Sequence, residues 1–280
     1  MDRPRMRSNP TMPSDHTDAE VALAAAVAGA AAVRSRYGTD LAPLAKSPTD
    51  FVTEADLAAE EEIHRVISAA RPSDGFVGEE TGTTGGHSGR RWLVDPLCGT
   101  LNFAAATPLA AVNVALDTPV GVTAAVSADP IAEEFFWTDG SGAWVRYGDT
   151  DRPLEPSPRS LIVDVNCDGK RDALFVGAQL IADQGFRDVF APRVLSSTLA
   201  VAWVAAGRRA AYVTDGHLEG SVHFAAGIAI CQAAGCVVTD FAGDPVHTGR
   251  GLIAAADQAT HRQLVELLGP HLEQLHAQDG

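Results

Sequence analysis

The segment that decides the fold is WLVDPLCGTLNFAAATP, which spans residues 92–108. Its apolar start ends at Asp95-Pro96, a pattern that is typical of a buried strand with an acid at its end. Cys98-Gly99-Thr100 has the composition of a tight turn, and Asn102-Phe103 continues into the expected start of a helix. An acid at the end of a strand beside a glycine turn predicts a catalytic or metal-binding turn, in which the cysteine is unexpected.

The composition of the chain is that of a globular enzyme, with 280 residues of which 46% are apolar and 20% are charged. The formal net charge of −15 speaks against nucleic acid or an anionic membrane as a partner. No apolar run reaches the roughly 18 residues of a membrane span. Residues 1–16 hold no apolar core of a secretory signal, so we expect a disordered tail there. The four cysteines show no zinc-ribbon or CxxC spacing, and a cytoplasmic location fits them best.

The pattern of apolar residues divides the chain into two halves. Residues 17–153 begin with two helices, the second capped by Thr53, and continue as strands separated by turns. A loop is expected around Pro43 and Pro48. Residues 154–280 alternate strands and helices, with one helix expected at about 170–186. This order predicts the α/β class.

Three acidic clusters lie at the ends of expected elements. Asp50, Glu54 and Asp56 surround the start of the second helix, Glu79-Glu80 follows a strand, and Asp95 follows another. Carboxylates beside glycine-rich turns suit Mg²⁺, which prefers hard oxygen ligands and keeps several waters. Each cluster alone is a weak signal, because Asp56 would also interact favourably with its helix dipole and Glu79-Glu80 would be ordinary in a solvated loop.

Taken together and in this order, the clusters resemble the inositol monophosphatase family. The resemblance runs through KSPTDFVTEAD, VGEET, WLVDPLCGTLNF, DPIAEEFFWTDGSGAW and HFAAGIAICQAAGCVVTD, and it covers roughly residues 20–270. It implies a layered αβαβα sandwich of the sugar phosphatase type. The α+β half over 17–153 would carry the metal-site motifs, and the α/β half over 154–280 would complete the site and the substrate pocket. It also implies Mg²⁺-dependent removal of phosphate from small molecules, and a homodimer.

The resemblance also implies roles for single residues. Glu79 would bind the first metal ion and, together with Thr100, activate the attacking water. Asp95 would bridge two ions, and Leu97 would offer its backbone carbonyl to the first. Asp56 would hold a weaker third ion, directly or through water.

The substrate side of the site is expected at two places. The amides of Gly99 and Thr100, at a helix start, would bind the phosphate group. The segment TDGHLEGSVH, residues 214–223, departs from the family pattern and suggests a pocket unlike that of the inositol enzymes. We expect Asp215, His217 and Glu219 in this segment to contact the substrate.

Two residues depart from the family pattern at a single subsite. Cys98 stands where the family has Asp, and Val222-His223 stands where it has Trp-Asp. Because both family aspartates bind the second metal ion, we expect Cys98 and His223 to be neighbours. Mg²⁺ binds thiolate and imidazole poorly, whereas softer transition ions accept both.

Three hypotheses remain open at this point. The first is a phosphatase for a sugar, cyclitol or nucleotide phosphate, with one Mg²⁺ ion or a softer divalent ion at the altered subsite. The second is a repurposed, metal-independent lyase or cyclase in which Cys98 and His223 supply a nucleophile or a general acid. The third is a non-catalytic binding module. Taken singly, either residue would be a tolerated thiol or a bonded histidine, but the change of both at one subsite favours a functional replacement.

Overall fold

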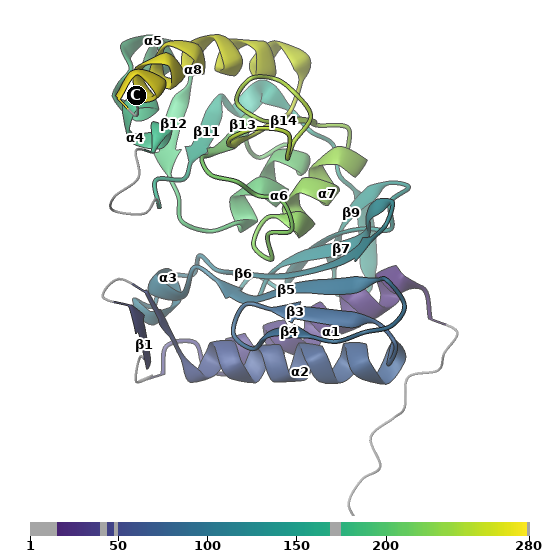
Figure 1. Cartoon of the computed structure of the whole chain (residues 1–280). Helices are drawn as coiled ribbons and strands as arrows, with labels where there is room; N and C mark the ends of the chain where they lie inside the picture. Colours follow the sequence, from purple (N-terminus) through teal and green to yellow (C-terminus); the bar gives the residue numbers. More distant parts are fainter. Residues whose placement is uncertain (1–15, 40–43, 48–49, 169–174, 279–280) are drawn as a thin grey trace, which may run out of the picture.

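Five layers make up the protein in the computed structural model, which describes residues 16–39, 44–47, 50–168 and 175–278. Figure 1 shows helices α1 and α2 below a first sheet, α6 and α7 above it, then a second sheet, and α4, α5 and α8 on the outside. The expected αβαβα sandwich is therefore confirmed. Nearly all of the expected N-terminal tail, residues 1–15, lies outside the described residues.

The outer helix layer begins with α1 (Asp18–Arg34) and α2 (Glu54–Ala70), each of which starts with a capping box. In α1 the Thr17 hydroxyl accepts from the Glu20 backbone N–H, and the Glu20 carboxylate accepts from the Thr17 N–H. In α2 Thr53 and Asp56 form the same reciprocal pair. The buried faces of both helices pack on one apolar cluster with the first sheet. These helix starts are local in sequence, and both agree with the prediction.

The first sheet has eight strands in the order β10-β9-β8-β7-β6-β5-β3-β4. Its strands are β3 (Gly75–Gly78), β4 (Gly82–Thr84), β5 (Arg91–Cys98), β6 (Ala111–Thr118), β7 (Gly121–Asp129), β8 (Glu134–Thr138), β9 (Ala143–Tyr147) and β10 (Thr150–Pro153). β3 and β5 are parallel, and the other neighbours are antiparallel. Because side chains alternate along a strand, Trp92 and Val94 pack toward α1 and α2, while Leu93 packs toward α7.

The second sheet has five strands in the order β12-β11-β13-β15-β14. Its strands are β11 (Ile162–Val165), β12 (Ala191–Val194), β13 (Ala211–Thr214), β14 (Val237–Thr239) and β15 (Leu252–Ala255). The described helices of this half are α4 (Val176–Ala182), α5 (Gln184–Val189), α6 (Leu199–Ala205), α7 (Ala225–Ala233) and α8 (Gln258–Gln278), and a 3₁₀ turn lies at Pro158–Ser160. None of the helices in the described ranges has the length and apolarity to cross a membrane.

Two local expectations differ from the structure. Where a plain loop was expected, β1 (Leu44–Ser47) and β2 (Asp50–Val52) pair as a short antiparallel ladder. The single helix expected at about 170–186 is divided at Asp183, because this residue leaves the helical conformation and caps α5 by accepting the Phe186 N–H at 2.9 Å. Residues 40–43, 48–49 and 169–174 lie outside the described parts.

The middle helix α7 joins the two halves of the chain. Its residues Ala225, Ala226 and Ala229 form one buried cluster with Leu93 of β5, and with alanines of β6 and β7. A helix from the second half therefore covers the first sheet. The division at 153/154 remains a prediction, and this shared cluster argues that neither half closes its core alone.

Candidate active site

The parallel pair β3 and β5 places two predicted acids at the same edge of the first sheet. Gly78 pairs with Val94 in the register, so Glu79 and Asp95 are the next residue of each strand. The Glu79 N–H donates to the Val94 carbonyl at 3.1 Å, which continues the ladder by one step. Neighbouring strand ends thus bring two acids 16 residues apart in sequence to one place.

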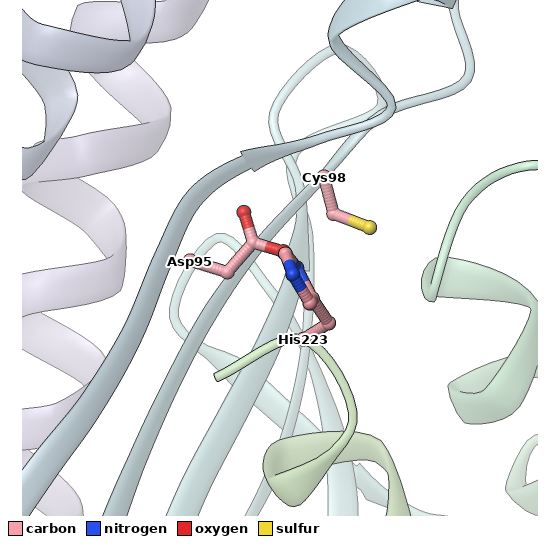
Figure 2. Close-up of side chains that lie close together, drawn as sticks. All are labelled: Asp95, Cys98 and His223. Atoms are coloured by element: carbon pink, nitrogen blue, oxygen red, sulfur yellow. The ribbon is translucent and has the colours of Figure 1, made fainter. Parts of the chain in front are cut away.

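Asp95 is the buried centre of the site. Its side chain is fully buried, and its Oδ1 accepts the Leu97 N–H at 3.1 Å. Its Oδ2 lies 2.7 Å from Nδ1 of His223, which comes from the segment before α7. Figure 2 shows Asp95, Cys98 and His223 close together. The two halves of the chain therefore meet at this carboxylate.

The Thr100 hydroxyl connects Asp56 to the turn after β5. Its Oγ1 lies 3.1 Å from Asp56 Oδ1 and 3.1 Å from the Leu97 carbonyl oxygen. Asp56 is fully buried, and its Oδ2 accepts the N–H and the hydroxyl of Thr53. Burial raises the pKa of Asp56, although the hydrogen bonds from Thr53 and Thr100 oppose this shift. A buried carboxylate of this kind is stabilised by a nearby cation.

Gly99 makes the turn between β5 and α3 (Thr100–Ala104) possible. Its φ of +98° lies in the left-handed region, which side chains rarely allow. A Cβ at this position would lie 2.9 Å from the Leu109 carbonyl oxygen and 3.2 Å from that of Ser196. Asn102 Nδ2 donates to the same two oxygens, at 3.1 and 2.8 Å. The turn therefore packs closely against the segment of the second half that contains Ser196.

Cys98 lies at the end of β5 beside the start of α6. Its Sγ accepts the Thr198 N–H at 3.4 Å. One ligand atom each of Cys98, Asp95 and His223 lies within 4.8 Å of the other two. Burial and the nearby charge of Asp95 raise the pKa of the Cys98 thiol, although His223 opposes this shift. Without a bound ion, the thiol therefore stays protonated at neutral pH. The expectation that Cys98 and His223 are neighbours agrees with this geometry.

The charge state of His223 is set by Asp95. Burial of the ring disfavours its charged form, but the hydrogen bond and charge of Asp95, with a smaller effect of Cys98, raise the pKa of His223 to about 12. In the ion-free protein an imidazolium therefore balances the buried carboxylate. Because its side chain is 42% exposed, the ring remains accessible from solvent.

Glu60 supports the turn that carries Glu79. This residue of α2 is 1% exposed, and its carboxylate accepts the backbone N–H groups of Glu80 and Thr81 at 2.9 and 2.8 Å. A Cβ on Gly78 would lie 2.5 Å from the Glu60 carboxyl carbon, so the glycine leaves space for this contact. The sequence prediction missed Glu60, although its spacing of four residues from Asp56 places both acids on one face of the helix.

A row of buried polar residues extends from Asp95 across the sheet. Asn113 of β6 lies opposite Asp95, and Ser127 of β7 lies opposite Asn113. Asn113 Nδ2 donates to the Thr198 hydroxyl at 2.7 Å, whereas Asn113 Oδ1 and Ser127 Oγ have no hydrogen-bond partner within the described structure. Buried polar atoms without partners are rare, so this row marks the space beside Asp95 as polar.

The three predicted substrate contacts lie in different surroundings. The buried Asp215 carboxylate pairs with Arg250 and accepts the N–H groups of Val176 and Gly216, at 2.9 and 2.7 Å. His217 is exposed. Glu219 lines a cavity of about 430 Å³ with Arg91, which stands at the start of β5, whereas Asp95 stands near its end. Their contact with substrate remains a prediction.

The predicted residues fall into two sets. Hydrogen bonds join Asp56, Leu97 and Thr100 in one set, and the other set groups Cys98 and His223 with Asp95. No pattern in the sequence pointed to Thr198, whose contact with Cys98 spans 100 positions. Asn113 could have been found from the sequence, since it is a polar residue within an otherwise apolar strand segment.

Comparisons with known proteins agree on one relationship. A model of the inositol monophosphatase family matches residues 14–276. An inositol-1-monophosphatase of Caulobacter vibrioides is 35% identical over 239 residues, which cover 82% of this chain and 91% of the relative. The Nus factor SuhB of Pseudomonas aeruginosa is 32% identical over 243 residues, which cover 81% and 86%. The solved structure of the extragenic suppressor protein suhB from Bartonella henselae has a TM-score of 0.78 at 30% identity, covering 89% of this chain and 97% of that one.

Proposed function

The chain belongs to the inositol monophosphatase family and is an enzyme of the phosphoric monoester hydrolase class; on this premise, we propose that it hydrolyses a small phosphorylated metabolite at the site around Asp95. Sugar, cyclitol and nucleotide phosphates are the candidate substrates. The observation that carries the proposal is the buried Asp95 carboxylate, which lies in β5 next to the strand end that bears Glu79. Leu97 connects Asp95 to the Asp56–Thr100 pair, because its N–H donates to Asp95 and its carbonyl accepts from Thr100.

The oxygen side of the site fits Mg²⁺, the ion that the family generally uses. We define this side as Asp56, Glu79, the Leu97 carbonyl and Thr100, with Asp95 shared between both sides. Its donors are hard oxygens, as Mg²⁺ prefers, and Asn113 Oδ1, across the ladder from Asp95, is a buried acceptor without a partner in the described residues. Glu79, Asp95 and Leu97 would hold this ion, and Asp56 a weaker one.

The sulfur–nitrogen side, defined as Cys98 and His223, does not fit a second Mg²⁺ ion. It offers a thiol and an imidazole where a hard ion needs anionic oxygens. The proposal therefore includes a remodelled second subsite, which holds no ion, a softer divalent ion, or only the imidazolium charge of His223.

The residues of the chain divide the reaction between them. A bound Mg²⁺ ion supplies positive charge for the phosphate oxygens and acidifies water. Glu79 and Thr100 would orient the attacking water, and the Glu79 carboxylate would accept its proton. The backbone amides of Gly99 and Thr100 bind the phosphate oxygens, because the turn leaves them near the start of α3. His223 lies close enough to Asp95 to add positive charge on the side of the leaving oxygen.

The repurposed, metal-independent hypothesis is the weaker one. A nucleophilic cysteine needs a lowered pKa, but burial and Asp95 raise that of Cys98. A general acid works best with a pKa near the working pH, and that of His223 is raised to about 12. A purely binding module has no use for the buried carboxylates of Asp56 and Asp95, each of which costs free energy to desolvate.

A small molecule is the partner that we propose. The net charge of −15 disfavours nucleic acid as a partner of this chain, although one of its relatives is named Nus factor SuhB. The homodimer and the cytoplasmic location remain predictions from the sequence.

A phosphate-release screen tests the proposed function. Wild-type protein with Mg²⁺ is offered inositol, sugar and nucleotide phosphates, and at least one class should release inorganic phosphate. Glu79→Gln should lower this rate at least about 100-fold, since it removes a charged ligand. The control Glu133→Gln changes an exposed acid paired with Arg34 and should leave the rate unchanged. Absence of release from every class, or equal rates in Glu79→Gln and wild type, would contradict the proposal.

A further inference from the structure

We propose that Asp95, Cys98 and His223 form a binding site for a soft or borderline divalent ion, such as Zn²⁺ or Co²⁺, and that this site discriminates against Mg²⁺. The inference deepens the proposed function, because it assigns a class of ion to the remodelled subsite. Because ion binding is measured without substrate, a negative result would contradict this proposal and leave the phosphatase proposal to be decided by phosphate release.

The geometry of the three ligand atoms suits a single ion. A carboxylate oxygen, a sulfur and an imidazole nitrogen lie within 4.8 Å of one another (Figure 2). Zinc binds such atoms at about 2.0–2.3 Å, so ligands of one ion stand about 3–4 Å apart. This spacing is closer than the 4.8 Å limit but farther apart than the 2.7 Å hydrogen bond between Asp95 Oδ2 and His223 Nδ1, whose proton the ion would replace. Small rotations of the side chains would therefore close the site around one ion.

The chemistry of the donors selects the ion. Thiolate and imidazole ligands favour zinc and cobalt, whereas Mg²⁺ requires near-octahedral oxygen coordination. One sulfur, one nitrogen and one oxygen ligand also leave the fourth position of a tetrahedral ion open. Catalytic zinc sites have this arrangement, since the open position takes water or a substrate oxygen. The site therefore has the donor set of a catalytic soft-ion centre.

Contacts around the three residues hold them in place. The Leu97 N–H donates to Asp95 Oδ1 at 3.1 Å, and the Thr198 N–H donates to Cys98 Sγ at 3.4 Å. The Thr198 hydroxyl is itself bonded to Asn113. Supporting hydrogen bonds of this kind orient metal ligands and tune the bound ion. The 42% exposure of His223 gives an ion a route from solvent.

Cobalt spectroscopy tests the proposal. Chelator-treated, dialysed protein is titrated with Co²⁺ at slightly alkaline pH, which favours loss of the ligand protons. Wild type should bind one Co²⁺ at this site, with a sulfur-to-cobalt charge-transfer band in the near ultraviolet. Zn²⁺ should remove the band, and a large excess of Mg²⁺ should not. Cys98→Ser should lose the band and bind the ion at least about tenfold more weakly, as expected for a lost ligand.

Three further variants keep the result interpretable. Cys236→Ser changes a partly buried thiol outside the site and should keep the band. Glu79→Gln should also keep it, although the proposed phosphatase activity is lost. Cys98→Asp combined with His223→Asp should lose the band and bind Mg²⁺ more tightly than wild type.

Three results would overturn the proposal. The first is a wild-type protein that binds Co²⁺ without a sulfur band. The second is an unchanged band in Cys98→Ser, which would assign the sulfur to another cysteine. The third is displacement of Co²⁺ by Mg²⁺ as readily as by Zn²⁺.

Discussion

The oxygen side and the sulfur–nitrogen side of the site share one carboxylate and differ in how they balance its charge. On the oxygen side, the side chains of the described residues that bond buried Asp56 are Thr53 and Thr100, neither of which is cationic, and burial raises the pKa of Asp56. On the sulfur–nitrogen side, His223 supplies a positive charge from within the chain. We therefore expect the oxygen side to depend on an external cation. The positive charge of the His223 imidazolium, or an ion that replaces its proton, would neutralise the sulfur–nitrogen side.

Removing the shared charge should have the largest effect. Asp95→Asn keeps the shape of the side chain but takes the negative charge from both sides at once. We expect phosphate release to fall at least about 100-fold, because both sides lose a ligand. The measurement is turnover at saturating Mg²⁺ on a substrate found in the screen. Asp117→Asn, at the other end of the β5–β6 ladder, is the control. Near-native turnover of Asp95→Asn would contradict the proposal that both sides of the site depend on this carboxylate.

Disturbing the oxygen side alone should have an intermediate effect. Glu60→Gln removes one of the two acceptors that hold the Glu80 and Thr81 N–H groups, so Glu79 loses its fixed position. We expect the Mg²⁺ concentration for half-maximal rate to rise roughly 10- to 100-fold. The KM for substrate at saturating Mg²⁺ should stay unchanged, which a general loss of structure would not produce.

The matched control is Glu61→Gln, the next residue of α2, which is exposed. It should leave the Mg²⁺ requirement as in wild type. If Glu60→Gln shifts thermal stability but not the Mg²⁺ requirement, the role of Glu60 is structural only.

The smallest effect should be a pH-dependent change in stability from the sulfur–nitrogen side. The folded-state pKa of His223 is raised from 6.5 to about 12. Its stabilising contribution is therefore complete below pH 6.5 and is lost progressively as the pH rises toward 12. In ion-free buffer, urea unfolding of wild type and His223→Gln should show a stability difference that narrows from pH 7 to pH 10. A difference that stays constant from pH 7 to pH 10 would mean that the ring is neutral in the folded protein.

The sequence predicted those parts of the molecule that are encoded locally. The helix starts at Thr17 and Thr53 follow from capping residues within three positions, and both were found. The neighbourhood of Cys98 and His223 was predicted through the family resemblance, since no local rule connects residues so far apart.

The parts that were missed depend on tertiary contacts. The hydrogen bond from Thr198 to Cys98 joins different elements, and only the packing of α6 against the end of β5 creates it. The division of the expected helix at Asp183 depends on a capping bond that competes with helical continuation. Glu60 could have been found, because a glutamate one turn after Asp56 on a buried helix face requires partners.

The placement of α7 has a consequence for how the protein is made. Residues 17–153 leave the ribosome before α7, at about 5–20 residues per second. Until Ala225–Ala233 emerges, the face of the first sheet around Leu93 and Ala125 lacks its cover. Asp95 also lacks the imidazole that balances its charge. A nascent chain that stops before residue 223 thus has neither a closed core nor a complete site, so activity is acquired only in the last stage of synthesis.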